Sequence, residues 1–192
     1  QNPDRQLFSA SVFEDVSFGP LNLGLDEATV RRRVADALAA VGMAEQADRP
    51  VHHLSFGQKK RVCIAGVLAM EPDLLLLDEP MAGLDADMQV ELLNVLDTLA
   101  ASGITIVLST HDVDFAYRWA DAIHLLAAGR CTASFRAVDL PGEAGALSGA
   151  GQPLPTVIEL HRTLVARGVV APHPAPRSID ALQSLLAPKE RH

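Results

Sequence analysis

Two adjacent carboxylates follow directly on a short apolar run of the chain. Residues 74–77 are four leucines, Asp78 and Glu79 come next, and Pro80 ends the run. Such a run is typical of a strand buried on both faces of a parallel sheet, and open α/β sheets bind ligands at the carboxyl ends of their strands. We therefore expect Asp78 to hold Mg²⁺ through water and Glu79 to polarise an attacking water. The alternative is a buried strand that ends in an acidic turn.

Further polar motifs lie on both sides of this pair. Residues 54–62 read LSFGQKKRV, residues 83–85 read GLD, and a second apolar run leads into His111. Ser55 and Gly57 begin a predicted helix, whose unpaired N–H groups and positive dipole end favour an anion. Gly57 also allows close backbone approach. The imidazole of His111 follows a predicted strand, where it can donate to a bound group; a structural hydrogen bond is the alternative.

Together with Gln1, these motifs resemble the Q-loop, signature, Walker B, D-loop and switch histidine of ABC transporter nucleotide-binding subunits, in that order. Each motif alone is weak, but all of them in the family's order are very unlikely by chance. The segments QLFSASVFEDVSFGPLNLGL and LSFGQKKRVCIAGVLAMEPDLLLLDEPMAGLDA are similar to the cobalt and energy-coupling-factor importer ATPases, the CbiO type. Phe56 stands where a glycine is common in the signature, and such a phenylalanine is seen within this subfamily.

The resemblance assigns roles in catalysis. It implies ATP and Mg²⁺ as ligands, with Asp78 as the metal-side carboxylate and Glu79 as the base that orients water. It implies that His111 contacts the γ-phosphate and senses whether it is present. Gln1 resembles the Q-loop glutamine, which touches the metal and couples to the membrane subunit.

The resemblance also assigns residues to the contact between two ATPase subunits. Ser55, Gly57 and Gln58 belong to the signature, which closes over the ATP held by the opposite subunit, so that ATP joins a head-to-tail dimer. Asp85 resembles the D-loop aspartate, which crosses the subunit interface. The implied partners are a second ABC ATPase subunit, identical or different, and a transmembrane transporter subunit.

One expected motif is missing from the chain. No G-x-x-x-x-G-K-[ST] loop occurs in the 192 residues. This P-loop supplies the lysine and the amide cradle for the phosphates, and in the family it precedes the Q-loop. We therefore expect the chain to be the carboxyl-terminal part of an ABC ATPase, through truncation, a split gene or a frameshift. Loss of the first strands is expected to expose an apolar sheet edge and promote association.

The expected fold class is α/β and P-loop NTPase-like, with a mostly parallel sheet, a helical signature subdomain and the amino-terminal strands missing. A helical or irregular stretch at 12–18 is expected to break at Gly19 and Pro20. Asp26, Asp85 and Asp112 are expected to cap helices. Apolar patterns and turn residues predict helices at 26–42, 55–70, 85–103 and 112–120, and strands at 74–77, 104–108, 122–126 and 131–135.

Composition divides the chain into three expected parts. Residues 1–138 are the ABC ATPase domain, and residues 139–155 are a linker rich in Gly, Ala, Ser and Pro. Residues 156–192 form a carboxyl-terminal helical extension, with helices near 156–167 and 178–186. This extension resembles that of the energy-coupling-factor ATPases, where it helps to pair two ATPase subunits.

The bulk composition restricts the partners. The net charge of −8 disfavours a sequence-independent grip on nucleic acid, which requires a basic surface. No apolar run approaches the ~18 residues that a membrane span needs. We therefore expect a peripheral protein at the cytoplasmic face of the membrane, held there by its partner.

The leading functional hypothesis is an ATP-hydrolysing subunit, or part of one, of an importer for cobalt or a related metal ion or vitamin. One alternative is a non-catalytic remnant that only completes a partner ATPase's site. The other is a non-transport ABC ATPase, which the short segment between Gln1 and Leu54 disfavours because that class inserts a coiled coil or arm there.

The missing P-loop generates a prediction about nucleotide binding. Because these residues contain no phosphate cradle, we expect the chain alone to bind ATP weakly or not at all. Isothermal titration calorimetry with ATP and Mg²⁺ measures this directly. Micromolar affinity would contradict the expectation.

Overall fold

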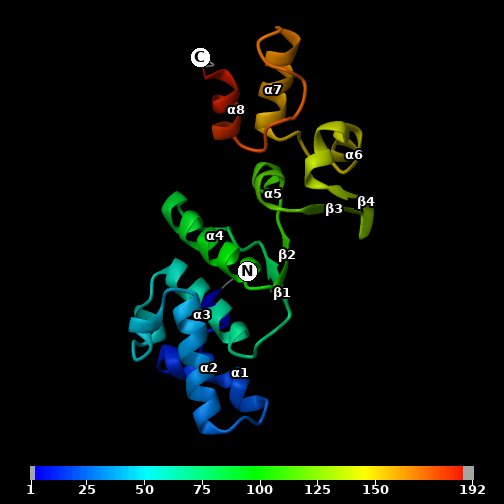
Figure 1. The fold of residues 1–192 in the computed structure, drawn as a ribbon. Coiled ribbons are helices and arrows are strands. Elements are labelled where there is room, and N and C mark those ends of the chain that lie inside the picture. Colours follow the sequence, from blue (N-terminus) through cyan, green and yellow to red (C-terminus); the bar gives the residue numbers. More distant parts are fainter. Residues whose placement is uncertain (1–2, 188–192) are drawn as a thin grey trace. The chain divides into compact units, whose positions relative to one another are not determined.

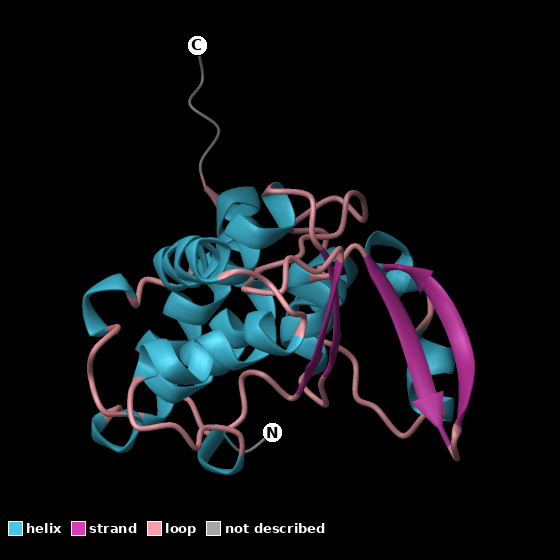
Figure 2. Cartoon of the chain, turned by 90° about the horizontal axis from the view of Figure 1, so that it is seen from below, coloured by secondary structure: helices cyan, strands magenta, loops and turns pink. Residues whose placement is uncertain are grey.

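The structure is a computed structural model that describes residues 3–187 (Figure 1). The chain divides into two compact units, Gln1–Ser109 and Thr110–His192. Within the described residues, the strands form two separate two-stranded sheets, one in each unit (Figure 2). No helix among residues 3–187 is long and apolar enough to cross a membrane.

Three helices that pack pairwise form the amino-terminal part of the first unit: α1 (Val12–Asn22), α2 (Glu27–Ala40) and α3 (Phe56–Leu68). Short 3₁₀ turns at Pro3–Arg5, Ala44–Gln46 and Val51–His53 lie around them. Asp26 caps α2 as expected, because its carboxylate accepts from the backbone N–H and the hydroxyl of Thr29. The bond from the Thr29 hydroxyl is the main reason why the pKa of Asp26 lies below its usual value. The buried apolar stripe includes Val12, Val16, Val34, Leu38, Val62 and Ala65.

Helix α1 continues through Gly19 and Pro20, so the predicted break there is wrong. A Cβ at Gly19 would lie 2.9 Å from the Met70 side chain and 3.3 Å from the Gly66 carbonyl oxygen. The glycine therefore lets α1 approach the end of α3 closely. Pro20 is buried only two residues before the helix ends. Tertiary packing outweighs the local helix-breaking tendency.

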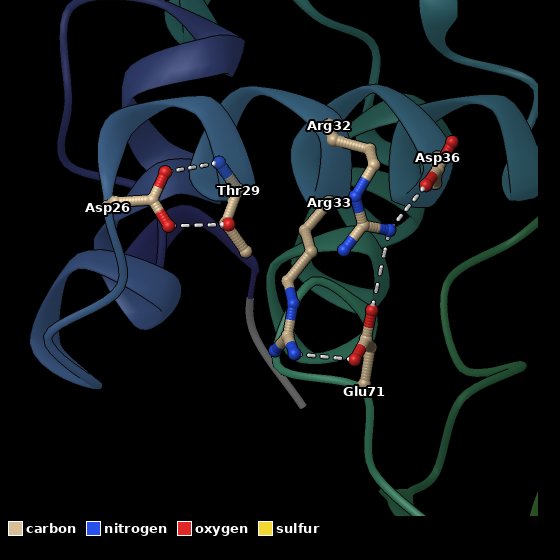
Figure 3. A network of polar contacts seen from close by, with 6 residues as sticks. All are labelled: Asp26, Thr29, Arg32, Arg33, Asp36 and Glu71. Atoms are coloured by element: carbon tan, nitrogen blue, oxygen red, sulfur yellow. Dashed lines mark hydrogen bonds and ion pairs between the residues drawn. The ribbon is translucent and has the colours of Figure 1, made fainter.

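A polar network joins α2 to the turn after α3 (Figure 3). Arg33 pairs with Glu71 at 2.6 Å, and Arg32 lies 3.5 Å from Asp36 and 3.9 Å from the same Glu71. The Arg33 side chain is only 18% exposed, whereas that of Arg31 is 65% exposed. The three consecutive arginines are therefore not one uniform solvated face.

The first unit contains a parallel strand pair with a helical crossover, which confirms the expected α/β class. Strand β1 (Leu74–Asp78) pairs with β2 (Thr105–Ser109), and Asp78 lies opposite Ser109. Helix α4 (Ala86–Ala101) connects them, begins at the Asp85 cap as expected, and buries Leu92, Leu96 and Leu99.

The four leucines predicted that β1 is buried on both faces, and this prediction is wrong. Leu75 is 1% exposed, but Leu74 and Leu76 are 48% and 69% exposed. Successive strand residues point to opposite faces, so among residues 3–109 only the face that carries Leu75 is covered. A continuous apolar run is typical of a strand that is covered on both faces, but within the first unit only one face of β1 is covered.

The second unit begins with α5 (Val113–Trp119), capped by Asp112 as expected, and an antiparallel hairpin of β3 (Ala122–Ala127) and β4 (Arg130–Arg136). The 3₁₀ segment Ala137–Gly142 and helices α6 (Ala144–Gly149), α7 (Thr156–Ala166) and α8 (Ile179–Leu186) follow. Their shared core includes Tyr117, Ile123, Leu125, Leu140, Leu147, Ile158 and Leu182.

The segment 139–155, predicted to be a linker, contains ordered structure. It includes most of the 3₁₀ segment and all of α6. Leu140 and Leu147 are each 1% exposed and pack in the same core as Ile158 of α7. Because small residues dominate this segment, its composition did not indicate that these two leucines are buried. The boundaries of the expected domains stay a prediction.

The Arg33–Glu71 pair generates a prediction about stability. We expect Arg33→Met to lower the free energy of unfolding of the first unit by about 1 kcal/mol, because the substitution removes the closer partner of Glu71 and leaves it only Arg32 at 3.9 Å. The matched control is Arg31→Met, whose partner Glu27 forms a fully exposed pair and whose loss costs about 0.5 kcal/mol or less.

Urea titrations with two probes measure the difference. Circular dichroism follows both units, whereas fluorescence of Trp119, the chain's single tryptophan, follows the second unit. The loss in Arg33→Met should appear in the first probe and not in the second. Equal losses in the two variants would contradict the assigned role of the network.

Candidate functional site

The two carboxylates lie at the carboxyl end of the parallel strand pair, where Ser109 holds the side chain of Asp78 and the backbone of Glu79. The Ser109 hydroxyl donates to Asp78 Oδ1. The Glu79 backbone N–H donates to the Ser109 carbonyl oxygen at 3.1 Å and to its Oγ at 3.2 Å. Glu79 has φ of +46°, which is a strained region for a residue with a side chain. The bonds from the neighbouring strand hold it in that conformation.

This arrangement fits a hydrated divalent cation at Asp78. Mg²⁺ prefers carboxylate oxygens and keeps several of its waters. Asp78 is exposed and anchored through Oδ1, and a carboxylate has further acceptor sites on its second oxygen. Glu79, the next residue, is half-buried.

Lys60 of α3 holds the loop that follows β1. Its Nζ donates to the carbonyl oxygens of Pro80 and Ala82, both at 2.6 Å. The side chain is buried, and this burial lowers the pKa of Lys60 while the charge of Glu79 opposes the shift. The loop that begins with the catalytic candidate is therefore attached to the helix that begins with the signature.

The signature residues form a regular helix start. The Ser55 hydroxyl accepts from the Gln58 backbone N–H at 3.3 Å, and the Gln58 side chain accepts from the Ser55 N–H at 2.9 Å. The Ser55 oxygen accepts in this capping box, so its own O–H can still donate to a ligand. Gly57 has a packing role as well, because a Cβ there would lie 2.8 Å from the sulfur of Met88 in α4.

The D-loop residues 83–85 form the turn that leads into α4. Asp85 caps α4 by accepting from the Met88 N–H at 2.9 Å. Gly83 has φ of +74°, and a Cβ there would lie 3.1 Å from Cε1 of Phe56. The D-loop turn therefore requires a glycine for its conformation and packs directly under the signature phenylalanine.

A cavity of about 350 Å³ brings four of the predicted nucleotide-binding residues together. Ser55, Gly57, Gln58 and Asp85 all line it. Arg61 and Glu91, which pair at 3.3 Å, lie on the same wall. The start of α3, the positive end of the helix dipole, therefore opens into this cavity, whose lining also carries the carboxylates of Asp85, Asp87 and Glu91.

A second cavity of about 450 Å³ lies beside the carboxylate end of β1. Its lining includes Asp78, Pro80, Lys60 and Cys63. Burial raises the pKa of the Cys63 thiol to about 11, so the thiol stays protonated at neutral pH. This agrees with an inert packing role for this cysteine.

Of the two remaining predicted site residues, the structure describes only His111. Gln1 falls outside the described residues 3–187. His111 is exposed in the second unit, directly before Asp112. Its expected approach to the γ-phosphate site stays a prediction, as do the chemical roles of the other site residues.

The sequence had not identified Lys60 and Ser109 as supporting residues. Lys60 lies four positions after Phe56, on the same side of α3, and this spacing is the only local signal of its role. Ser109 ends a strand beside an acidic strand end, but only the register that pairs it with Asp78 gives it a partner.

Comparisons with known proteins agree with these motifs. The family model for the ABC transporter domain matches residues 1–82. The chain is 49% identical over 191 residues to a putative ABC transporter ATP-binding protein of Streptomyces coelicolor, covering 96% of this chain and 65% of the relative. It is 48% identical to the cobalt import ATP-binding protein CbiO of Rhodobacter capsulatus, covering 97% of this chain and 67% of the relative.

An energy-coupling factor transporter ATP-binding protein, EcfA of Carboxydothermus hydrogenoformans, is 55% identical, over 69% of this chain and 49% of the relative. The chain thus spans about half to two thirds of the length of these curated relatives. Among solved structures, CbiO1 from Clostridium perfringens, part of the complex cbiONQ, matches with a TM-score of 0.68 and 42% identity. That match covers 84% of this chain and 64% of CbiO1.

The contact between Gly83 and Phe56 generates a prediction. Gly24 and Gly83 have nearly equal φ values, +75° and +74°, but only Gly83 has a neighbour at its Cβ position. We expect Gly24→Ala to cost about 1 kcal/mol of stability for the left-handed backbone alone. Gly83→Ala should cost about 1 kcal/mol more, because its methyl group meets the Phe56 ring.

Urea unfolding followed by circular dichroism measures both losses. The second substitution Phe56→Ala should remove the excess in Gly83→Ala but leave Gly24→Ala unchanged. Equal losses for the two glycine variants would show that Phe56 and Gly83 do not pack as described.

Proposed function

This chain belongs to the ABC transporter ATPases, and from that membership we propose that it is the water-activating and signature-bearing part of an importer's ATP-binding subunit. The observation that carries the proposal is the pair of adjacent carboxylates at the end of β1. Ser109 holds the Asp78 side chain and the Glu79 backbone, and Lys60 attaches the next loop to α3, the helix that Ser55 caps. The activity proposed is ATP hydrolysis coupled to transport.

Asp78 and Glu79 divide the work on one nucleotide. When bound, Mg²⁺ neutralises charge that develops on the phosphates. Asp78 would hold the ion through water, with Gln1 as a second ligand. Glu79 would orient the attacking water and accept its proton at the side-chain carboxylate. His111 would donate a hydrogen bond to the γ-phosphate from the start of the second unit.

The signature serves a different nucleotide. Ser55, Gly57 and Gln58 would face the ATP held by the opposite subunit of a head-to-tail dimer, with the Ser55 O–H and the first amides of α3 as donors. Asp85, on the same cavity, would cross the interface. No P-loop motif occurs in the 192 residues, so the phosphate cradle of each nucleotide is proposed to come from residues outside them.

The names of the relatives support a proposal for the partners and the cargo. The names of the relatives CbiO and EcfA refer to cobalt import and energy-coupling factor transport. We propose that a transmembrane subunit holds this chain peripherally at the cytoplasmic face of the membrane, and that the cargo is cobalt or a related metal ion or vitamin.

A second candidate function is a non-catalytic module that only completes a partner ATPase's site. The 350 Å³ cavity supports it, because the signature and D-loop residues that would act on a partner's nucleotide all lie within this chain. In the first function turnover requires both Glu79 and Ser55, whereas in the second it requires only Ser55.

Two substitutions in the ATPase purified as its native assembly separate these functions. Glu79→Gln should lower the rate of ATP hydrolysis about 10²-fold or more while ATP binding is retained, because the amide cannot accept the proton. Ser55→Arg should also lower turnover, because its side chain fills the cavity that would face the partner's ATP. The exposed Glu45→Gln is the matched control.

Turnover that falls in Ser55→Arg but not in Glu79→Gln would favour the non-catalytic module. Turnover unchanged in both variants would overturn both functions.

A further inference from the structure

A lysine with no role in the functions assigned above is buried at the junction of the two candidate sites. Lys60 is 8% exposed. Its Nζ lies 2.6 Å from the carbonyl oxygens of Pro80 and Ala82 and 3.5 Å from that of Glu79. These carbonyl groups belong to the turn between the carboxylates of β1 and the D-loop.

Burial of an ammonium group is unfavourable unless its donors are satisfied. Lysine has three N–H donors and no acceptor in its charged form, and three carbonyl oxygens surround this nitrogen. Charge-assisted bonds of this kind are about twice as strong as neutral ones. The turn 79–82 is therefore held from the side of α3 by one cation.

The Phe56 ring reinforces this attachment. It lies one helical turn before Lys60, with the ammonium 5.4 Å from the ring centroid. The same ring packs on Gly83, where a Cβ would be 3.1 Å away. The start of α3 and the turn after β1 are thus joined twice, once by hydrogen bonds and once by packing.

We propose that Lys60 is a positioning residue that fastens the turn 79–82 to the first turns of α3. The attachment maintains one fixed geometry between the carboxylate of Glu79 and the signature. It acts through the backbone, since Lys60 holds the carbonyl groups that follow the left-handed Glu79. The claim about catalysis rests on the proposed function, whereas the claim about the turn does not.

Hydrogen–deuterium exchange on the full chain tests the attachment without ATP. The reporters are the N–H groups of Glu79, Ala82 and Leu84, which bond to Ser109, Glu79 and Met81. We expect Lys60→Met to accelerate their exchange about tenfold or more, with α2 unchanged. Lys59→Met is the matched control, because this neighbouring lysine pairs with Asp4 and not with the turn.

Graded variants keep the test decisive if Lys60→Met does not fold. Lys60→Arg retains N–H donors and charge and should restore most of the protection, and Lys60→Gln should lie between Arg and Met. Exchange of the turn that is unchanged in Lys60→Gln and Lys60→Met, or equally fast in Lys59→Met, would overturn the proposal.

Turnover in the native assembly tests the positioning role. Lys60→Gln should lower kcat about tenfold, with KM for ATP changed less than about twofold, because the donors of Lys60 are directed at the carbonyl groups of the turn. Lys60→Arg should recover most of kcat. Faster exchange without a lower kcat would overturn the positioning role and leave ATP hydrolysis standing.

A wild-type assembly that hydrolyses no ATP would overturn the proposed function and the catalytic part of this inference. The exchange measurement would still decide the attachment of the turn.

Discussion

The backbone of the turn after β1 must be held in a conformation that it would not adopt alone. Glu79 is left-handed without being glycine, and Gly83 is left-handed four residues later. Ser109 holds the turn from the neighbouring strand, and the buried ammonium group of Lys60 holds it from α3. A cation is effective here because it satisfies several carbonyl groups at once in a poorly solvated space. The positions of the catalytic candidate and of the D-loop both depend on this double attachment.

The turn after β1 also connects the carboxylates to the signature, two sites that would act on different nucleotides. The carboxylate end of β1 offers oxygen atoms for a hydrated cation and a water, whereas the start of α3 offers N–H groups for an anion. Acceptor oxygens for a cation and N–H donors for an anion thus lie on the two sides of one short turn. Phe56, in place of the common signature glycine, adds packing to a junction that otherwise depends on hydrogen bonds.

Local patterns were sufficient to predict much of this fold. Short-range signals placed a strand at the leucine run and helix caps at Asp26, Asp85 and Asp112, and tertiary structure did not override them. The burial predicted for both faces of that strand was wrong, because it depends on distant covering layers. Features that depend on distant partners could not be predicted. Helix α1 crosses Gly19 and Pro20 because Met70 packs there, and Leu140 and Leu147 are anchored by helices further along the chain. In the sequence, Lys60 cannot be distinguished from other helical lysines, because its partners lie about 20 residues further along the chain.

The most direct test is a structure of the native assembly with Mg²⁺ and a non-hydrolysable ATP analogue. The account predicts a water in line with the γ-phosphate and within about 3 Å of the Glu79 carboxylate. It predicts that Asp78 faces the Mg²⁺ and that Ser55 faces the nucleotide of the opposite subunit. It also predicts that Lys60 remains on the carbonyl groups of Pro80 and Ala82. A Glu79 carboxylate directed away from the γ-phosphate, with Ser55 facing solvent, would contradict it.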